Sequence, residues 1–188
     1  MVAFFNGLLI NLNMKKFSLA FLLLVLFTSN SLFAQKNLVL NGGFEDDFFG
    51  WNNGGGAQQT PWDFKSGKNS CAIVTANTDN WVGIDQTVRI PKKVQDIEFS
   101  AWIKTNNVVK GKNDWDGAVF TIVFLDGDDK DMTSQDVNIA RLTGYTPWTL
   151  YKKTIKMPDK AYSFKILLAM GNASGTLLVD DVAAVKVD

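Results

Sequence analysis

Short runs of β-favouring residues, separated by clusters of Gly, Asn, Asp and Pro, fill the sequence after Gln35. They cover residues 37–40, 70–76, 82–90, 96–105, 118–125, 148–157, 162–170 and 176–187. No stretch in this part of the sequence combines a helical period with capping residues. The pattern therefore predicts an all-β fold, a two-sheet antiparallel β-sandwich of the jelly-roll type.

Alternation within two runs predicts which side chains face a core. In the run 82–90 one face is apolar apart from a single amide: Ile84, Gln86, Val88 and Ile90. In the run 96–105 the inward residues are Ile97, Phe99, Ala101 and Ile103. Trp102 falls on the opposite, otherwise polar face, which is unusual for a large aromatic side chain.

A basic and then apolar segment precedes the β-rich part of the chain. Lys15 and Lys16 are followed by the apolar run 19–27, which is short for a bilayer span, and Ala34 precedes Gln35. These features predict a secretory signal peptide cleaved after Ala34. Retention as an uncleaved anchor stays open, and Met14 is an alternative start. We expect an N-terminal extension and signal peptide over 1–34 and one domain over 35–188, in a secreted, periplasmic or cell-surface protein.

The residue composition excludes several classes of function. The chain has no histidine, which excludes Ser-His-Asp and Cys-His catalysis and the usual zinc ligand sets. Cys71 is the single cysteine, so we expect no intramolecular disulfide and a small buried side chain. Loss of the leader removes two lysines and no acids, leaving a net charge of about −2, so we expect no nucleic-acid or membrane partner. We also expect a monomer.

Two acidic clusters lie near the two ends of the predicted domain. Glu45, Asp46 and Asp47 follow a pair of glycines, and Asp180 and Asp181 lie inside the last run. A carboxylate in an apolar strand is costly to bury without a positive partner. Ca²⁺ binds six to eight oxygens, including main-chain carbonyls, so one ion could join both ends. The alternative is that Asp180 accepts hydrogen bonds from backbone amides and that the other cluster is solvated.

Six fragments, taken in order, resemble a known family. They are NLVLNGGFEDDFFGW, KSGKNSCAIV, VGIDQTVRI, IEFSAWIK, TPWTLYKKTIKMP and LLVDDVAAVKV. Together they resemble the galactose-binding-like jelly-roll domains of the carbohydrate-binding module type, particularly the family found on bacterial cellulases and xylanases. The resemblance spans residues 37–187. It implies a structural Ca²⁺ held by Glu45, Asp180, the loop around Gly43 and the backbone near Lys68.

Domains of this fold bind glycans across a sheet or at rim loops, using flat aromatic surfaces and polar side chains. Trp51 and Trp148 are expected in the core. The candidate sugar platforms stand in polar surroundings: Trp81, Trp102, Trp115 and Trp62. Gln86 lies in the resembling fragment IDQTV and is a further candidate, although its inward position suits a bond to buried backbone. The run 162–170 offers no amide on its outer face, so rim binding and groove binding both stay open.

The expected function is secreted, non-catalytic binding of a polysaccharide or oligosaccharide. A cell-surface structural or adhesive β-sandwich with a protein partner is the alternative. A glycoside hydrolase or polysaccharide lyase is disfavoured, because glycoside hydrolysis uses a pair of carboxylates and the chain contains only two glutamates, Glu45 and Glu98. The many aspartates of residues 126–131 are typical of a solvated turn.

Overall fold

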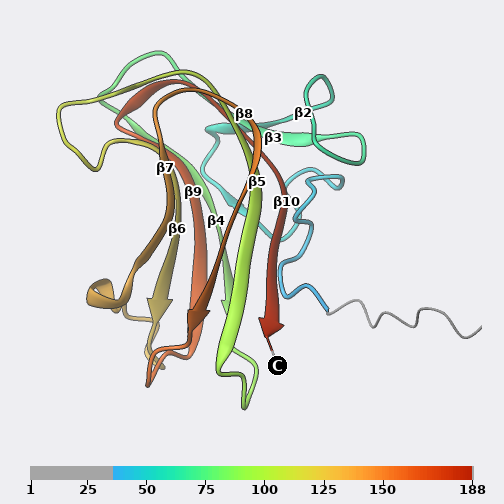
Figure 1. Cartoon of the computed structure of the whole chain (residues 1–188), viewed down its shortest axis with the longest axis vertical. Coiled ribbons are helices and arrows are strands. Elements are labelled where there is room, and N and C mark those ends of the chain that lie inside the picture. The colour runs from blue at the N-terminus through green and yellow to red at the C-terminus, as the bar shows by residue number, and fades with distance from the viewer. Residues whose placement is uncertain (1–35, 188) are drawn as a thin grey trace, which may run out of the picture. The chain divides into compact units, whose positions relative to one another are not determined.

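The computed structural model describes residues 36–187, so the predicted leader lies outside the described residues. Ten strands and one short 3₁₀ helix, η1 (Thr133–Gln135), make up this part of the chain (Figure 1). The strands are β1 (Asn52–Asn53), β2 (Ala57–Thr60), β3 (Ser70–Thr75), β4 (Trp81–Arg89), β5 (Asp96–Lys110), β6 (Gly117–Leu125), β7 (Val137–Leu142), β8 (Gly144–Lys156), β9 (Ser163–Gly171) and β10 (Ala173–Val187). Within residues 36–187, no helix has the length and apolarity needed to cross a membrane.

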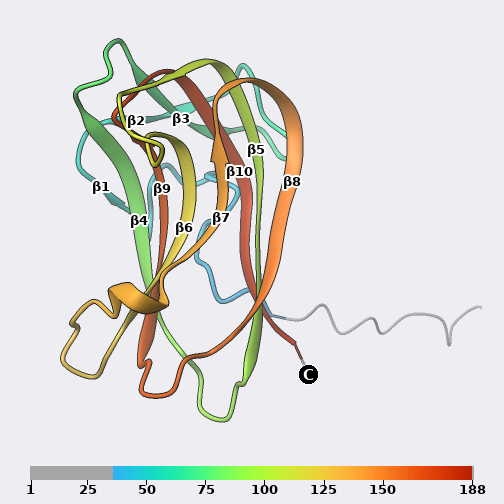
Figure 2. The same cartoon turned by 60° about the vertical axis from the view of Figure 1, so that its left-hand side comes forward.

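The strands form two antiparallel five-stranded sheets packed face to face (Figures 1 and 2). Sheet A has the order β1-β4-β9-β6-β7, and sheet B has the order β2-β3-β10-β5-β8. This arrangement confirms the predicted two-sheet jelly roll. We call the face of each sheet that points away from the core its outer face.

The side chains between the sheets form one apolar core. Phe99 of β5 and Phe164 of β9 meet edge to face, with ring centroids 4.9 Å apart. The predicted inward residues of β5 are all buried, and Trp102 lies on the outer face of sheet B. Cys71 is fully buried, and burial raises the pKa of its thiol, as expected for a structural cysteine.

Three short strands were not predicted, and one predicted run is not a strand. β1 and β2 consist mostly of Asn and Gln, which carry little strand signal, and β7 is an edge strand. The run 37–40 is irregular because the Asn37 side chain replaces part of a strand ladder. Its Oδ1 accepts a bond from the Ala184 amide at 2.9 Å, and its Nδ2 donates to the Val182 carbonyl at 3.1 Å.

The start of the described chain docks against a bulge in β10. The pairing of β10 with β5 shifts between Asp180 and Ala183, and Asp181 has a φ of 48°. The Val182 amide donates to the Gly42 carbonyl at 2.9 Å, and any Cβ on Gly42 would collide with the Val182 carbonyl. A glycine is therefore required for this close approach, which brings residues 42–45 beside the bulge.

Candidate functional site

The acids from the two ends of the domain are neighbours around Gly43. A Cβ placed on Gly43 would lie 3.8 Å from Asp180 Oδ1, 3.7 Å from Asp181 Oδ1 and 3.9 Å from Glu45 Cγ. Phe44 anchors this segment, because its buried ring packs on Trp51 with centroids 5.2 Å apart. We call Glu45, Asp180 and Asp181 the acid cluster.

The loop between β2 and β3 supplies backbone amides to two members of the acid cluster. Asp180 Oδ2 accepts bonds from the Lys65 and Ser66 amides at 2.8 and 3.0 Å. Glu45 Oε1 accepts bonds from the amides of residues 68 and 69 at 2.8 and 3.1 Å. Burial raises the pKa of Asp180, although these N–H groups oppose the rise. The pKa of Glu45 is lowered, chiefly by the Lys68 amide.

The acid cluster has the donor chemistry of an oxygen-preferring cation site. Asp180 is fully buried, and no member of the cluster forms an ion pair within residues 36–187. In the same range, no three acidic, histidine or cysteine side chains are grouped so that they alone could hold a metal ion. An ion here would therefore need further oxygens from the main chain, such as those of Gly43 and Lys68, a mixture that suits Ca²⁺.

On the outer face of sheet A, the indole of Trp81 lies over the backbone of Gly171. The two residues are paired across β4 and β9, and a Cβ on Gly171 would lie at or within 3.0 Å of three ring carbons. The Trp81 side chain is 52% exposed. Because the ring rests on a residue without a side chain, it offers a flat, supported apolar surface to solvent.

A depression of about 440 Å³ begins at Trp81 and runs along the edge of β4. Its lining is Asn52, Gly54, Gly55, Gly56, Trp81, Val82, Gly83, Asp85 and Leu167, and we call it the Trp81 groove. Asn52 Nδ2 donates to Asp85 Oδ1 at 3.2 Å, which leaves the other Asp85 oxygen for a ligand. The groove thus combines an aromatic wall, a floor of small residues and one amide–carboxylate pair.

Trp115 lies at the same end of sheet A as Trp81. It stands two residues before Gly117, which pairs with Gly171, and its side chain is 60% exposed. Buried Asp116 holds the loop: Oδ2 accepts a bond from the Asn113 amide at 2.9 Å, and Oδ1 accepts one from Asn172 at 3.2 Å. The bond from the Asn113 amide lowers the pKa of Asp116, so this anchor is ionised at neutral pH.

Two other predicted platforms lie on the opposite sheet. Trp102 is on the outer face of sheet B, with the Lys65 ammonium 4.0 Å from the ring centroid, and Trp62 is in the loop between β2 and β3. Trp81 and Trp102 therefore lie on the outer faces of different sheets, and Trp115 and Trp62 lie in loops that lead into sheet A and sheet B. Trp148, expected in the core, is only half-buried and donates from Nε1 to Asp63 Oδ1 at 2.9 Å. Trp51, in contrast, is buried as predicted.

Gln86 points into the sandwich and clamps the backbone of Leu40. Its Oε1 accepts a bond from the Leu40 amide at 2.8 Å, and its Nε2 donates to the Leu40 carbonyl at 2.9 Å. The side chain is 4% exposed. This geometry supports the interpretation that Gln86 satisfies buried backbone, and it leaves neither end of the amide pointing to solvent.

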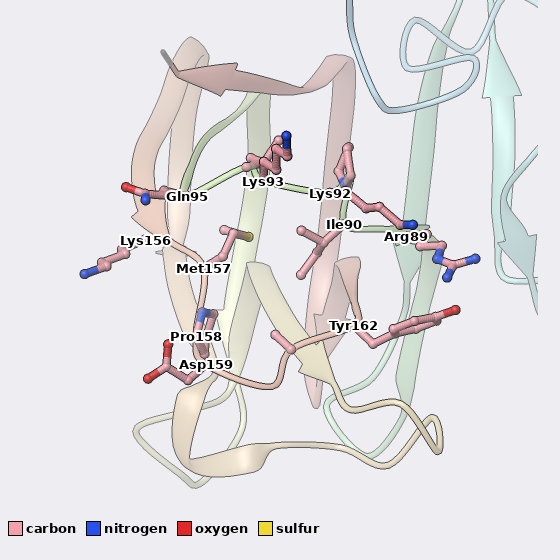
Figure 3. A pocket seen from close by; sticks show the side chains of 13 residues that line it. Arg89, Ile90, Lys92, Lys93, Gln95, Lys156, Met157, Pro158, Asp159 and Tyr162 are labelled. Carbon is pink, nitrogen blue, oxygen red and sulfur yellow. The ribbon is translucent and has the colours of Figure 1, made fainter.

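A second depression lies at one end of the sandwich, between the β4–β5 and β8–β9 loops (Figure 3). It measures about 540 Å³, and Ile90 and Met157 point into it while Lys93 and Lys156 extend from its rim. Arg89 stacks on Tyr162, with 4.3 Å between the guanidinium carbon and the ring centroid. The guanidinium thus covers one face of the Tyr162 ring, although the residue remains 42% exposed.

Sequence reasoning missed Asn52, Asp85, Leu167 and Gly171. Asp85 could have been found, because it lies four residues after Trp81 on the same face of one strand. Asn52 and Gly171 carry no such signal. Their roles depend on the pairing of β4 with β1 and β9, which local alternation does not specify.

No protein-family model matches the sequence, and a search of curated proteins finds no match. Solved structures share the fold. The CBM22-1 xylan-binding domain of Paenibacillus barcinonensis Xyn10C aligns with a TM-score of 0.56 and 20% identity, over 82% of this chain and 97% of that domain. TmCBM61, solved with β-1,4-galactotriose, gives a TM-score of 0.53 and 16% identity, over 81% and 99% of the two chains.

A domain described as enzymatically active also shares the fold. The enzymatically active domain of bacteriophage CBA120 tailspike protein 4 aligns with a TM-score of 0.62 and 15% identity, over 80% of this chain and 21% of that chain. At these identities the likeness establishes the fold. The fold is a two-sheet β-jelly roll, shared with solved carbohydrate-binding modules, the type of domain that the sequence fragments resemble.

Proposed function

We propose that this chain is a non-catalytic carbohydrate-binding domain whose Trp81 groove binds a segment of a neutral polysaccharide. The observation that carries the proposal is the half-exposed indole of Trp81, which lies on Gly171 at one end of a groove that contains the Asn52–Asp85 pair. A pyranose ring presents an apolar C–H face to an indole, while its hydroxyl groups need an amide or carboxylate beside it. Trp115, exposed in the loop before β6 at the same end of sheet A, is a candidate contact for a longer glycan.

The likeness to modules described as binding xylan and β-1,4-galactotriose favours a β-linked neutral glycan as the ligand. The small number of carboxylates available in the groove disfavours catalysis. The Trp81 groove contains one acid, Asp85, whereas glycoside hydrolysis normally requires two. Both glutamates are engaged elsewhere, Glu45 with backbone amides and Glu98 with Lys152 at 3.1 Å.

A structural Ca²⁺ at the acid cluster and secretion after loss of residues 1–34 complete the proposal. The ion is supported by the burial of Asp180, whose carboxylate accepts backbone amide bonds but forms no ion pair within residues 36–187, and by the nearby Glu45 and Asp181. When bound, it would neutralise the cluster and tie residues 43–45 to β10, so its role would be stability.

A glycan array followed by titration of a hit tests the proposal. Wild-type protein should bind a β-linked neutral glycan with a change in tryptophan fluorescence, and Trp81→Ala should weaken binding at least tenfold without loss of the folded state. Absence of reducing-sugar release would support the non-catalytic assignment. Failure to bind any glycan, together with capture of a protein ligand, would favour the adhesive alternative.

A further inference from the structure

The loop between β2 and β3, residues 61–69, exposes two aromatic side chains on the side of the molecule opposite the Trp81 groove. We call it the Trp62 loop. Trp62 is 89% exposed and Phe64 is 41% exposed. The outer face of sheet B also exposes Val74 on β3, at 64%, and Leu150 on β8, at 41%, with β10 and β5 between them. Two exposed aromatic side chains in one short loop are a candidate interaction surface.

The two aromatic residues are held in place by the residue between them. Asp63 Oδ1 accepts a bond from Trp148 Nε1 at 2.9 Å, and its Oδ2 pairs with Lys104 Nζ at 2.6 Å. Its carbonyl accepts a bond from the Ser70 hydroxyl at 2.7 Å. Asp63 is thus tied to β8, β5 and the start of β3, so the loop displays its aromatic residues on a fixed backbone and binding would cost little ordering entropy.

The second half of the Trp62 loop is fixed as firmly. Four of its amides donate to Asp180 and Glu45, as described above. The aromatic pair is therefore bordered by polar groups at known positions, namely Asp63, Lys65 and Lys104. Flat apolar surfaces bordered by hydrogen-bonding groups suit a sugar chain. Glu45 accepts the Lys68 amide of the loop, and the exposed acids Asp46 and Asp47 follow it in sequence, so the segment bound to the loop carries negative charge that opposes docking on an anionic membrane.

We propose that the Trp62 loop is a second glycan-binding surface, so that one domain engages polysaccharide on both outer faces. This inference rests on the proposed function of the Trp81 groove. The Trp81 groove lies on the outer face of sheet A, and the Trp62 loop contacts outward side chains of sheet B, so the two surfaces lie on opposite faces of the sandwich. A single straight glycan segment cannot reach both. The domain would therefore bridge two chains of one polysaccharide, or two distant segments, and gain avidity.

The test compares wild type with Trp62→Ala/Phe64→Ala and with Trp81→Ala, on soluble xylan and β-1,4-galactan of high molecular weight. The changed side chains are exposed, and circular dichroism checks that each variant is folded. Wild-type protein should migrate more slowly in gels that contain the polysaccharide. It should also increase the light scattering of the polysaccharide solution, because it cross-links the chains. The double variant should lose cross-linking and be retained about tenfold less, while its affinity for a short oligosaccharide stays within twofold of wild type.

Three results would overturn the proposal. In the first, the double variant cross-links as wild type does while Trp81→Ala loses binding; the groove then stands without a second surface. In the second, wild type binds none of these glycans, and the proposed function fails as well. In the third, the Trp62 loop promotes binding to phosphatidylserine–phosphatidylcholine vesicles or to a protein partner while polysaccharide retention is unchanged in the double variant.

Discussion

The indole of Trp81 lies across Gly171 of the neighbouring strand, with no room for a side chain between the ring and the backbone. A Cβ at position 171 would come to 3.0 Å or less from three ring carbons. The exposed platform thus depends on a glycine that carries no ligand-binding group. A substitution at Gly171 can therefore change the orientation of the Trp81 ring while the tryptophan itself is kept.

Gly171→Ala should displace the Trp81 ring and weaken glycan binding almost as much as Trp81→Ala does. Overpacking at this site should cost about 1–3 kcal/mol of folding stability, which leaves the protein folded. The measurement is oligosaccharide affinity by tryptophan fluorescence. Gly127→Ala is the matched control, because a Cβ there meets no atom within 4 Å and the residue lies outside the lining of the Trp81 groove, so its affinity should be unchanged. Equal affinities for Gly171→Ala and wild type would show that the ring position is irrelevant to binding.

Asp85→Asn should reduce glycan affinity about tenfold, equivalent to about 1.4 kcal/mol, because a carboxylate acceptor bonds sugar hydroxyl groups more strongly than an amide oxygen does. The change preserves the size of the side chain beside Asn52. Calorimetric titration gives the affinity, and Asp159→Asn, in the other depression, serves as the control. If both variants bind as wild type does, Asp85 makes no contact with the ligand.

The fold was predictable because the long strands carry strict alternation. Ile97, Phe99, Ala101 and Ile103 are all buried, as their spacing requires. The meeting of Glu45 with the Asp180 pair was predictable too, since the first and last segments of a sandwich tend to be adjacent.

The placement of Trp81 and Trp102 on different sheets was not predictable. Alternation places Trp81 and Trp102 on the outer faces of their strands, but it does not say which strands share a sheet. Sheet membership is decided by long-range pairing, such as that of Trp81 with Gly171. The anchoring of Asp63 depends on such pairing as well, because its partners Lys104 and Trp148 are distant in sequence.

Gln86→Met should lower stability and leave glycan affinity unchanged. The substitution removes both bonds to Leu40, and a buried backbone group left without a partner costs about 1–3 kcal/mol. We expect a loss of about 2–4 kcal/mol in chemical denaturation. Thr87→Val, on the exposed face of the same strand, should be close to neutral. A tenfold loss of affinity with unchanged stability would instead identify Gln86 as a sugar contact.

Removal of calcium should lower the melting temperature through the acid cluster. Calcium at a hundred times its dissociation constant would add about 2.7 kcal/mol, or about 5–10 °C in Tm for a domain of this size. Chelation should remove this gain in wild type. Asp180→Asn and Glu45→Gln should show no such gain, while Asp46→Asn, a neighbouring exposed acid, should respond as wild type does. An identical Tm with and without chelator in wild type would rule out the ion.

The pKa shifts give the sign of the pH dependence. Burial raises the pKa of Asp180 in the folded state, so the metal-free folded protein pays for an ionised buried carboxylate at neutral pH. That cost is relieved as the pH falls through the raised pKa. The pKa of Glu45 is lowered, so its stabilising contribution persists until the pH falls below about 4.

Between pH 7 and about 4, protonation of Asp180 should therefore stabilise the metal-free protein as acid is added. Over the same range the calcium-loaded protein should lose its advantage, because protons compete with the ion for the carboxylate. Scanning fluorimetry across this range, with chelator and with calcium, should show the two melting curves converging at low pH. Curves that stay equally separated down to pH 4 would place the calcium site elsewhere than at Asp180.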